Sequence, residues 1–235
     1  STSKQIFHCF GCHEGGDIIK FVQKIERLEW MDAVRHLSRE FGIPMPEFTR
    51  DRSISREAAD AERDEKEQAL AAVQFAADFF AKHLKERIAA GDEIRGYLNR
   101  RDLGPDVVEK FSLGLAPNAW TGLMDGAVKA GHSRDSLLNS GLATRHATKD
   151  RTYDRFRNRL IFPIHDTHGK PVAFGARVYA ADASPEEPKY INSPETLAYH
   201  KGQALYALHL AKDSITKLDQ AVLMEGYMEI GRAHV

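Results

Sequence analysis

Three stretches of sequence decide the fold of this chain: YDRFRNRLIFPI at residues 153–164, FGAR at 174–177 and PKYINSPET at 188–196. In the first stretch, arginine alternates with Phe156 and Asn158 before an apolar run begins. Successive side chains of a β-strand point to opposite faces. This period of two therefore predicts a strand with three guanidiniums on one face, those of Arg155, Arg157 and Arg159.

The residues that follow predict an antiparallel hairpin. Residues 160–164 and 172–179 both have the composition of strands, and the DTHG segment at 166–169 between them has that of a turn. In this arrangement Arg177 alternates with apolar neighbours and can reach the face that carries Arg157.

Positive charge is concentrated in the same part of the chain. Residues 145–177 hold eight Lys and Arg against three acids, a net charge of +5, whereas the whole chain carries −1. Cations beside Tyr and Phe suit a polyanion such as nucleic acid, because cations neutralise phosphates and aromatic rings stack on bases. The alternative is a solvated edge strand whose arginines prevent aggregation, and composition alone does not decide between the two.

These blocks, in this order and at this spacing, resemble the catalytic core of bacterial DnaG-type DNA primases. YLNRRDL at 97–103 and FSLGLAP at 111–117 also resemble blocks of that family, with Asp102 where the family has Gly. If that Gly has a positive φ, Asp can replace it at modest cost. The resemblance implies a DNA-directed RNA polymerase, a nucleotidyltransferase that makes short RNA primers on single-stranded DNA from ribonucleoside triphosphates during replication.

Composition and the two ends narrow the class of protein. The chain has 235 residues, is 42% hydrophobic and contains no long uncharged apolar run, so we expect no membrane span and no signal peptide. Both cysteines lie in one short motif, which favours a reducing compartment, here the bacterial cytoplasm. The chain starts at Ser1 without Met. Residues 229–235 resemble the translation of a common DNA sequencing adapter. We therefore expect an open fragment with a non-native tail.

The motif HCFGC at residues 8–12 predicts half of a zinc site. Cys9 and Cys12, with Gly11 at the bend, can direct two thiolates at one metal, but structural zinc takes four ligands. His8 and His13 are candidates, although their adjacency to the cysteines makes a tetrahedron awkward. A thioredoxin-like redox pair is the alternative, and the glycines that follow argue against it. The motif resembles the second half of the primase zinc ribbon, which implies two further ligands upstream of Ser1.

The helical segments are predicted from apolar spacing. Asp17 caps a helix that begins at Ile18, and a second helix ends at Gly42; we expect their apolar stripes to form the core of a small domain at residues 1–48. Charged residues 49–65 are predicted as a linker, with a segment already turning helical as the alternative, and residues 66–90 as an amphipathic helix docked on the catalytic core. Several short helices should fill residues 92–144, with Trp120 in the core.

The C-terminal part is expected to begin a second sheet. Ser193 and Pro194 favour a helix start, residues 205–217 a helix, and residues 221–224 a buried strand. Glu225 would stand at the C-terminal end of that strand, where parallel sheets bind ligands. The block VLMEGYM resembles the first motif of a Toprim domain, which implies that Glu225 is a catalytic acid. The family's later acids, which hold Mg²⁺ or Mn²⁺, would lie beyond this chain.

The predicted class is therefore α+β: a partial zinc ribbon (1–48), a linker (49–65), a basic subdomain with helices and an antiparallel sheet (66–200), and the start of an α/β Toprim domain (201–235). The resemblance implies contacts with nucleic acid or nucleotide for Arg101, Arg155, Arg157, Arg159, Arg177, Lys189, Tyr190, Asn192 and Lys201. It also implies a replicative helicase as partner, bound by a missing C-terminal domain. The alternative function is a non-catalytic module that binds single-stranded DNA through zinc ribbon and basic sheet.

Overall fold

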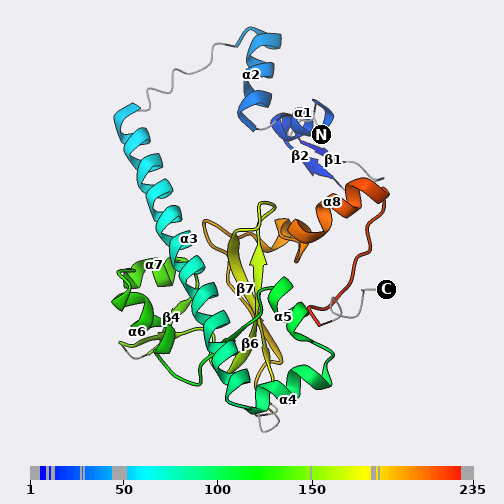
Figure 1. Cartoon of the computed structure of the whole chain (residues 1–235). Helices are drawn as coiled ribbons and strands as arrows, with labels where there is room; N and C mark the ends of the chain where they lie inside the picture. Colours follow the sequence, from blue (N-terminus) through cyan, green and yellow to red (C-terminus); the bar gives the residue numbers. More distant parts are fainter. Residues whose placement is uncertain are drawn as a thin grey trace. The chain divides into compact units, whose positions relative to one another are not determined.

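The computed structural model describes residues 6–8, 11, 14–26, 28, 30–43, 52–148, 150–180, 184 and 186–228. The chain divides into two compact units, Ser1–Arg56 and Glu57–Val235 (Figure 1). The boundary between them falls within the predicted linker at 49–65. Within the described residues, no helix is both long enough and apolar enough to cross a membrane.

The first unit contains a small hairpin and two helices. Strand β1 (Phe7–His8) pairs antiparallel with β2 (Gly15–Gly16), and helices α1 (Ile18–Glu26) and α2 (Trp30–Phe41) follow. The Asp17 carboxylate accepts a hydrogen bond from the Lys20 backbone N–H at 2.9 Å, as expected of a helix cap. Gly42, with φ of +61°, ends α2. Both predicted helices are confirmed.

The prediction that their apolar stripes form a core is wrong for the structure as described. Ile18, Phe21 and Phe41 are exposed, and 63% of Ile25 is accessible. Within the described part of this unit, Ala33 alone is buried. Two short helices and a two-residue hairpin offer too little surface to cover both stripes.

Helix α3 (Arg52–Ala89) is the longest element, and it begins well before the predicted start near residue 66. Residues 58–68 are helical but exposed, so the charged segment predicted as a linker is largely a solvated helix. Ala, Glu, Lys and Arg, which are abundant there, are strong helix formers even without a core to pack against. From Ala69 onward α3 docks on the second unit as predicted, burying Val73, Phe80 and Leu84.

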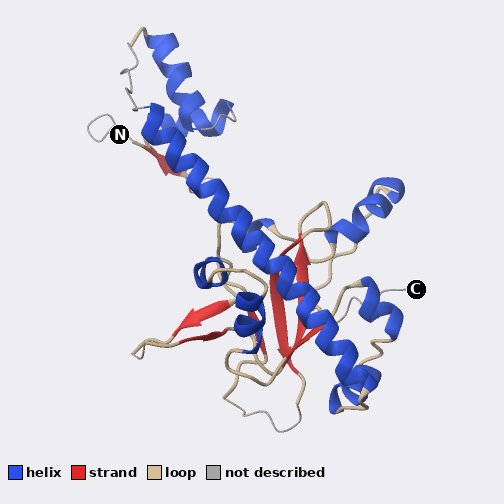
Figure 2. Ribbon diagram, turned by 60° about the vertical axis from the view of Figure 1, so that its left-hand side comes forward, coloured by secondary structure: helices blue, strands red, loops and turns tan. Residues whose placement is uncertain are grey.

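A four-stranded antiparallel sheet lies under the C-terminal half of α3 (Figure 2). Its order is β3 (Gly114–Ala116), β6 (Arg159–His165), β7 (Pro171–Val178) and β8 (Tyr190–Asn192). The β6–β7 pairing confirms the predicted hairpin. It sets Leu160 opposite Arg177, and β7–β8 sets Arg177 opposite Tyr190.

Short helices surround this sheet, as predicted, and the α+β class is confirmed. They are α4 (Glu93–Arg100), α5 (Pro105–Lys110), α6 (Gly122–Lys129) and α7 (Arg134–Asn139), followed by a two-stranded sheet of β4 (Ala143–Arg145) and β5 (Thr152–Asp154). A 3₁₀ turn, η1 (Lys201–Gln203), and α8 (Leu208–Leu218) come last. Asp102 has a φ of +57°, which agrees with its place at a family Gly.

The predicted arginine strand is wrong. Strand β5 ends at Asp154 and β6 begins at Arg159, so residues 155–158 form a loop between two different sheets. Asn158 turns this loop with φ of +49°, and its backbone N–H donates to the Pro117 carbonyl at 3.1 Å. Asn tolerates this left-handed conformation, and the turn breaks the alternation that would align the three guanidiniums.

Two predictions in the C-terminal part are also wrong. Ser193 does not start a helix: its backbone and hydroxyl pair with the backbone of Phe174 on β7, at 2.8 and 3.0 Å. Residues 221–224 are not a buried strand, since Val222 and Leu223 are 78% and 83% exposed. No described strand pairs with this segment, and an extended segment without a neighbour has no partner for its backbone.

Candidate nucleic-acid interface

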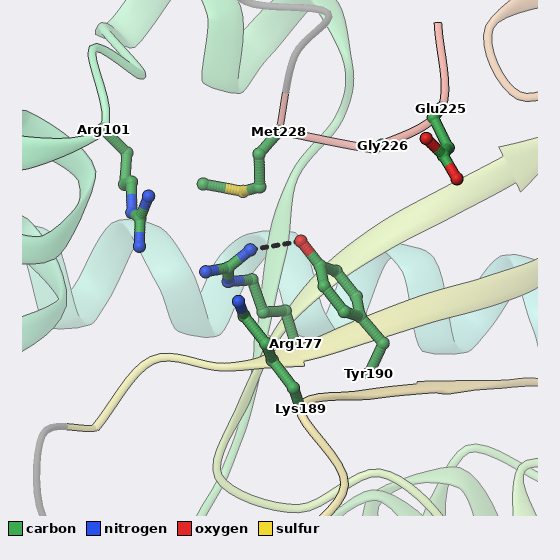
Figure 3. Close-up of a pocket in the computed structure, with 7 residues that line it drawn as sticks. All are labelled: Arg101, Arg177, Lys189, Tyr190, Glu225, Gly226 and Met228. Atoms are coloured by element: carbon green, nitrogen blue, oxygen red, sulfur yellow. Dashed lines mark hydrogen bonds between the residues drawn. The ribbon is translucent and has the colours of Figure 1, made fainter.

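A cavity of about 380 Å³ lies at the edge of the main sheet in the second unit. Its lining comes from the end of α4, from β7, from the start of β8 and from the C-terminal segment: Arg101, Arg177, Lys189, Tyr190, Glu225, Gly226 and Met228. Figure 3 shows three cationic side chains from separate segments pointing toward one another, with Glu225 apart on the C-terminal segment. Such a cavity favours an anionic ligand with a ring that can stack.

Arg177 is the most enclosed of these cations, with 7% of its surface exposed. Its Nη1 donates to the Tyr190 hydroxyl, and its guanidinium carbon lies 5.0 Å from the centroid of that ring. Its Nε is buried and makes no hydrogen bond within the described part of the chain. Because this guanidinium lines the cavity, it is well suited to donate to a ligand oxygen.

Arg159, predicted on the same face as Arg155 and Arg157, lies inside the protein instead. Its guanidinium pairs with the Glu187 carboxylate at 2.7 Å and donates to the Pro188 carbonyl at 2.8 Å. These contacts hold the segment that leads into Lys189. Arg159 thus supports, from inside the protein, the segment that carries Lys189 into the cavity lining.

Arg157 is also separated from the cavity and forms part of a second surface. Its guanidinium carbon lies 4.4 Å from the Trp120 ring centroid and 5.0 Å from that of Tyr153, and the two rings meet edge to face. We call Trp120, Tyr153 and Arg157 the aromatic platform. The prediction that Trp120 belongs to the core is wrong, because 66% of it is exposed.

The other predicted residues are distributed around these two surfaces. Arg155 Nε donates to the Asn192 carbonyl at 3.2 Å, so the loop after β5 is tied to β8. Lys201 is exposed on η1, and its backbone N–H donates to the Glu195 carboxylate at 2.9 Å. Neither Arg155, Asn192 nor Lys201 lines the described cavity.

Tyr227 places the C-terminal segment, and with it Glu225, beside the sheet. Its ring stacks on Phe162 at 5.2 Å, and its hydroxyl donates to the Asn192 side-chain oxygen at 3.2 Å. Burial raises the pKa of Tyr227 to about 12, which keeps the hydroxyl protonated. The ring lies so close to Gly175 that a Cβ there would be 2.7 Å from it, so this contact requires glycine.

Asp154 is a functional candidate that sequence reasoning missed. It is 2% exposed, and its carboxylate accepts the backbone N–H groups of Leu123 and Met124 at 2.7 and 3.0 Å. Burial raises its pKa to about 6, against the lowering effect of these hydrogen bonds. The sequence signal that could have identified Asp154 is its position as an acid within an arginine-rich stretch.

The predicted zinc half-site cannot be placed, because Cys9, Cys12 and His13 lie outside the described residues. His8 is described, at the end of β1. Among the residues with described positions, no group of three or more His, Cys, Asp or Glu could hold a metal ion.

A basic cavity and a separate, exposed aromatic platform are features typical of a nucleic-acid-binding surface. The family described as "DNA primase catalytic core, N-terminal domain" matches residues 79–212, and that described as "CHC2 zinc finger" matches residues 1–53. The chain belongs to the DNA primase family, as the sequence resemblance predicted.

Individual relatives agree with this assignment. A DNA primase of Halalkalibacterium halodurans is 36% identical over 231 residues, which are 98% of this chain and 36% of the relative. The zinc-binding and RNA polymerase domains of the Aquifex aeolicus primase match with 30% identity and a TM-score of 0.62, over 99% of this chain and 52% of that one. A DnaG primase catalytic domain bound to single-stranded DNA matches with 33% identity and a TM-score of 0.63, over 72% and 50%. This chain spans little more than a third of the curated relative's length.

Proposed function

We propose that the protein containing this chain makes RNA primers on a single-stranded DNA template from ribonucleoside triphosphates. The observation that carries the proposal is the cavity where Arg101, Arg177 and Lys189 converge beside Tyr190, with Glu225 at its edge. Phosphoryl transfer requires mainly that phosphates be positioned and their charge neutralised, and three converging cations provide both.

The domain assignment belongs to the same proposal. Residues 1–48 are the second half of a zinc ribbon, residues 49–65 join it to the core, residues 66–200 form the basic subdomain, and residues 201–228 open a Toprim domain. The match to the CHC2 zinc finger family and the arginine-lined cavity support the first and third of these. We propose a bacterial cytoplasmic protein at the replication fork, with a helicase partner bound outside this chain.

Each predicted residue has a part in binding. Arg101, Arg177 and Lys189 hold phosphates, and Tyr190 packs against a base or sugar. The aromatic platform guides the template strand, since Trp120 is exposed and Arg157 lies over it. Arg155 and Asn192 brace the loop after β5, Arg159 orients the wall, and the exposed Lys201 on η1 offers a further positive charge.

The catalytic metals do not fit the described residues by themselves. Two Mg²⁺ or Mn²⁺ ions need several carboxylate ligands, and Glu225 is the one carboxylate that lines the described cavity. We therefore assign to Glu225 only the acceptance of a proton during transfer.

A non-catalytic single-strand-binding module remains the second candidate, because neither the cavity nor the platform requires any chemistry to bind DNA. Incorporation of labelled nucleotides by the full-length protein on a single-stranded template decides between the two. Binding without incorporation would favour the module.

The binding surface is tested with Arg177→Ala. Loss of one phosphate contact should weaken binding to all single-stranded sequences and lower the salt slope by about 0.7, since each such contact releases a condensed counterion. Fluorescence anisotropy at several salt concentrations measures both quantities. Arg134→Ala, which removes an exposed charge from α7, is the control. If Arg177→Ala leaves both the affinity for single-stranded DNA and its salt dependence unchanged, Arg177 does not contact the DNA and has a structural role instead.

The zinc assignment predicts different behaviour for this chain and the complete protein. Because Cys9 and Cys12 supply two of four ligands, this chain should bind zinc weakly, whereas the protein with its upstream segment should bind one zinc tightly. Metal analysis after dialysis against a chelator measures the difference. Stoichiometric, chelator-resistant zinc on this chain would show that His8 or His13 completes the site.

A further inference from the structure

Asp154 connects the parts of the aromatic platform through its backbone. Its N–H donates to the Trp120 carbonyl at 2.8 Å, and its own carbonyl accepts from Arg157 Nη1 at 2.6 Å. The backbone of Asp154 thus hydrogen-bonds both to the backbone of Trp120 and to the guanidinium of Arg157, which lies over the Trp120 indole.

The carboxylate of Asp154 also holds the segment that follows Trp120. It accepts the N–H groups of Leu123 and Met124, which lie at the start of α6, immediately after the turn that carries Trp120. These two donors have no partner within the helix, so the carboxylate satisfies them and also meets the positive end of the helix dipole. The direction of chain after Trp120 is therefore set by Asp154.

The burial of this acid argues for a specific role. A charged side chain that is 2% exposed is expensive unless it is fully hydrogen-bonded, and Asp125 on α6 adds repulsion while Arg157 attracts. An exposed cap, such as Ser133 at the start of α7, stabilises a helix of similar length without this cost. Capping alone thus does not require a buried acid here.

We propose that Asp154 is a positioning residue that holds Trp120 under Arg157, in the geometry with which the platform stacks on a template base. This inference rests on the proposed function, because it assumes that the platform contacts single-stranded DNA. It assigns the acid in the arginine-rich stretch to the same surface as Arg157.

The test uses this chain with Trp30→Phe, so that Trp120 is the remaining tryptophan. Asp154→Asn keeps the size of the side chain but leaves one acceptor oxygen for two N–H donors. We expect Trp120 to become more accessible to acrylamide quenching, and binding to an oligo-dT strand to weaken about tenfold, within the range of one base–aromatic stack. Trp120→Ala should weaken binding by the same factor. The double variant should lose no more than Trp120→Ala alone.

Ser133→Ala is the matched control, because it removes the cap of α7 without touching the platform. A purely structural Asp154 would behave like it: a lower unfolding midpoint, with unchanged quenching and unchanged binding of the folded protein. That result overturns the inference. If Asp154→Asn does not fold, Asp154→Glu, which keeps the charge but moves it by one methylene, is judged by the same two measurements.

The two proposals can fail separately. Loss of binding in Trp120→Ala but not in folded Asp154→Asn overturns the inference alone. Wild-type binding in Trp120→Ala overturns the platform's role in the proposed function and this inference with it, while leaving the cavity to be judged by Arg177→Ala.

Discussion

Glu225→Gln in the full-length protein is expected to abolish primer synthesis while single-stranded DNA binding stays within about twofold of wild type. Gln keeps the shape and hydrogen bonding of the side chain but cannot accept a proton or carry charge. Loss of a positioned acid or base reduces rates by about 10²–10⁴-fold. Binding should persist, because the three converging cations and the aromatic platform are unchanged. Labelled nucleotide incorporation and anisotropy measure the two effects.

Asp213→Asn, which neutralises an exposed acid on α8, is the charge-matched control and should leave both quantities unchanged. Primer synthesis at nearly the wild-type rate in Glu225→Gln would mean that Glu225 is structural and that its assignment to a Toprim domain is wrong. Loss of binding together with synthesis would instead place Glu225 in the binding surface.

Local sequence pattern was sufficient for the elements that form the centre of the second unit. The β6–β7 hairpin follows from strand-forming composition on both sides of an Asp-x-x-Gly turn, and the Asp166 carboxylate closes that turn by accepting the backbone N–H groups of His168 and Lys170. The docked half of α3 follows from apolar residues three and four apart. In the helix the apolar pattern and the burial describe the same face, whereas β6 is buried on both faces of the sheet.

The arginine stretch shows where pattern fails. Arginines do alternate with other residues in the sequence, but the backbone turns at Asn158. As a result, Arg157 lies in the aromatic platform and Arg159 pairs with Glu187. The partner of Arg159 lies 28 residues further along the chain, and no local rule identifies it. The contacts of Trp120 with Tyr153 and Arg157 likewise join residues more than thirty positions apart, and its exposed position in the platform was not predicted.

The cavity was predicted in part. Arg101, Arg177, Lys189, Tyr190 and Glu225 were all named as site residues and all line it. They come from four segments, and their convergence required the family resemblance, because spacing along the chain does not encode it. The apolar segment at 221–224 was misjudged for a related reason: burial of a strand depends on neighbours that its own sequence does not specify.

Phe80→Ala is expected to destabilise the second unit by about 3–5 kcal/mol, the usual cost of emptying a buried phenylalanine site. Phe80 is fully buried, meets Phe174 of β7 edge to face at 5.6 Å, and packs so closely on Gly114 that a Cβ there would lie 2.5 Å away. Urea unfolding followed by Trp120 fluorescence in the Trp30→Phe background measures the change. Phe79→Ala removes the same atoms from the half-buried neighbouring position and should cost less. Equal costs for the two variants would contradict the docking of α3 through the Phe80 face.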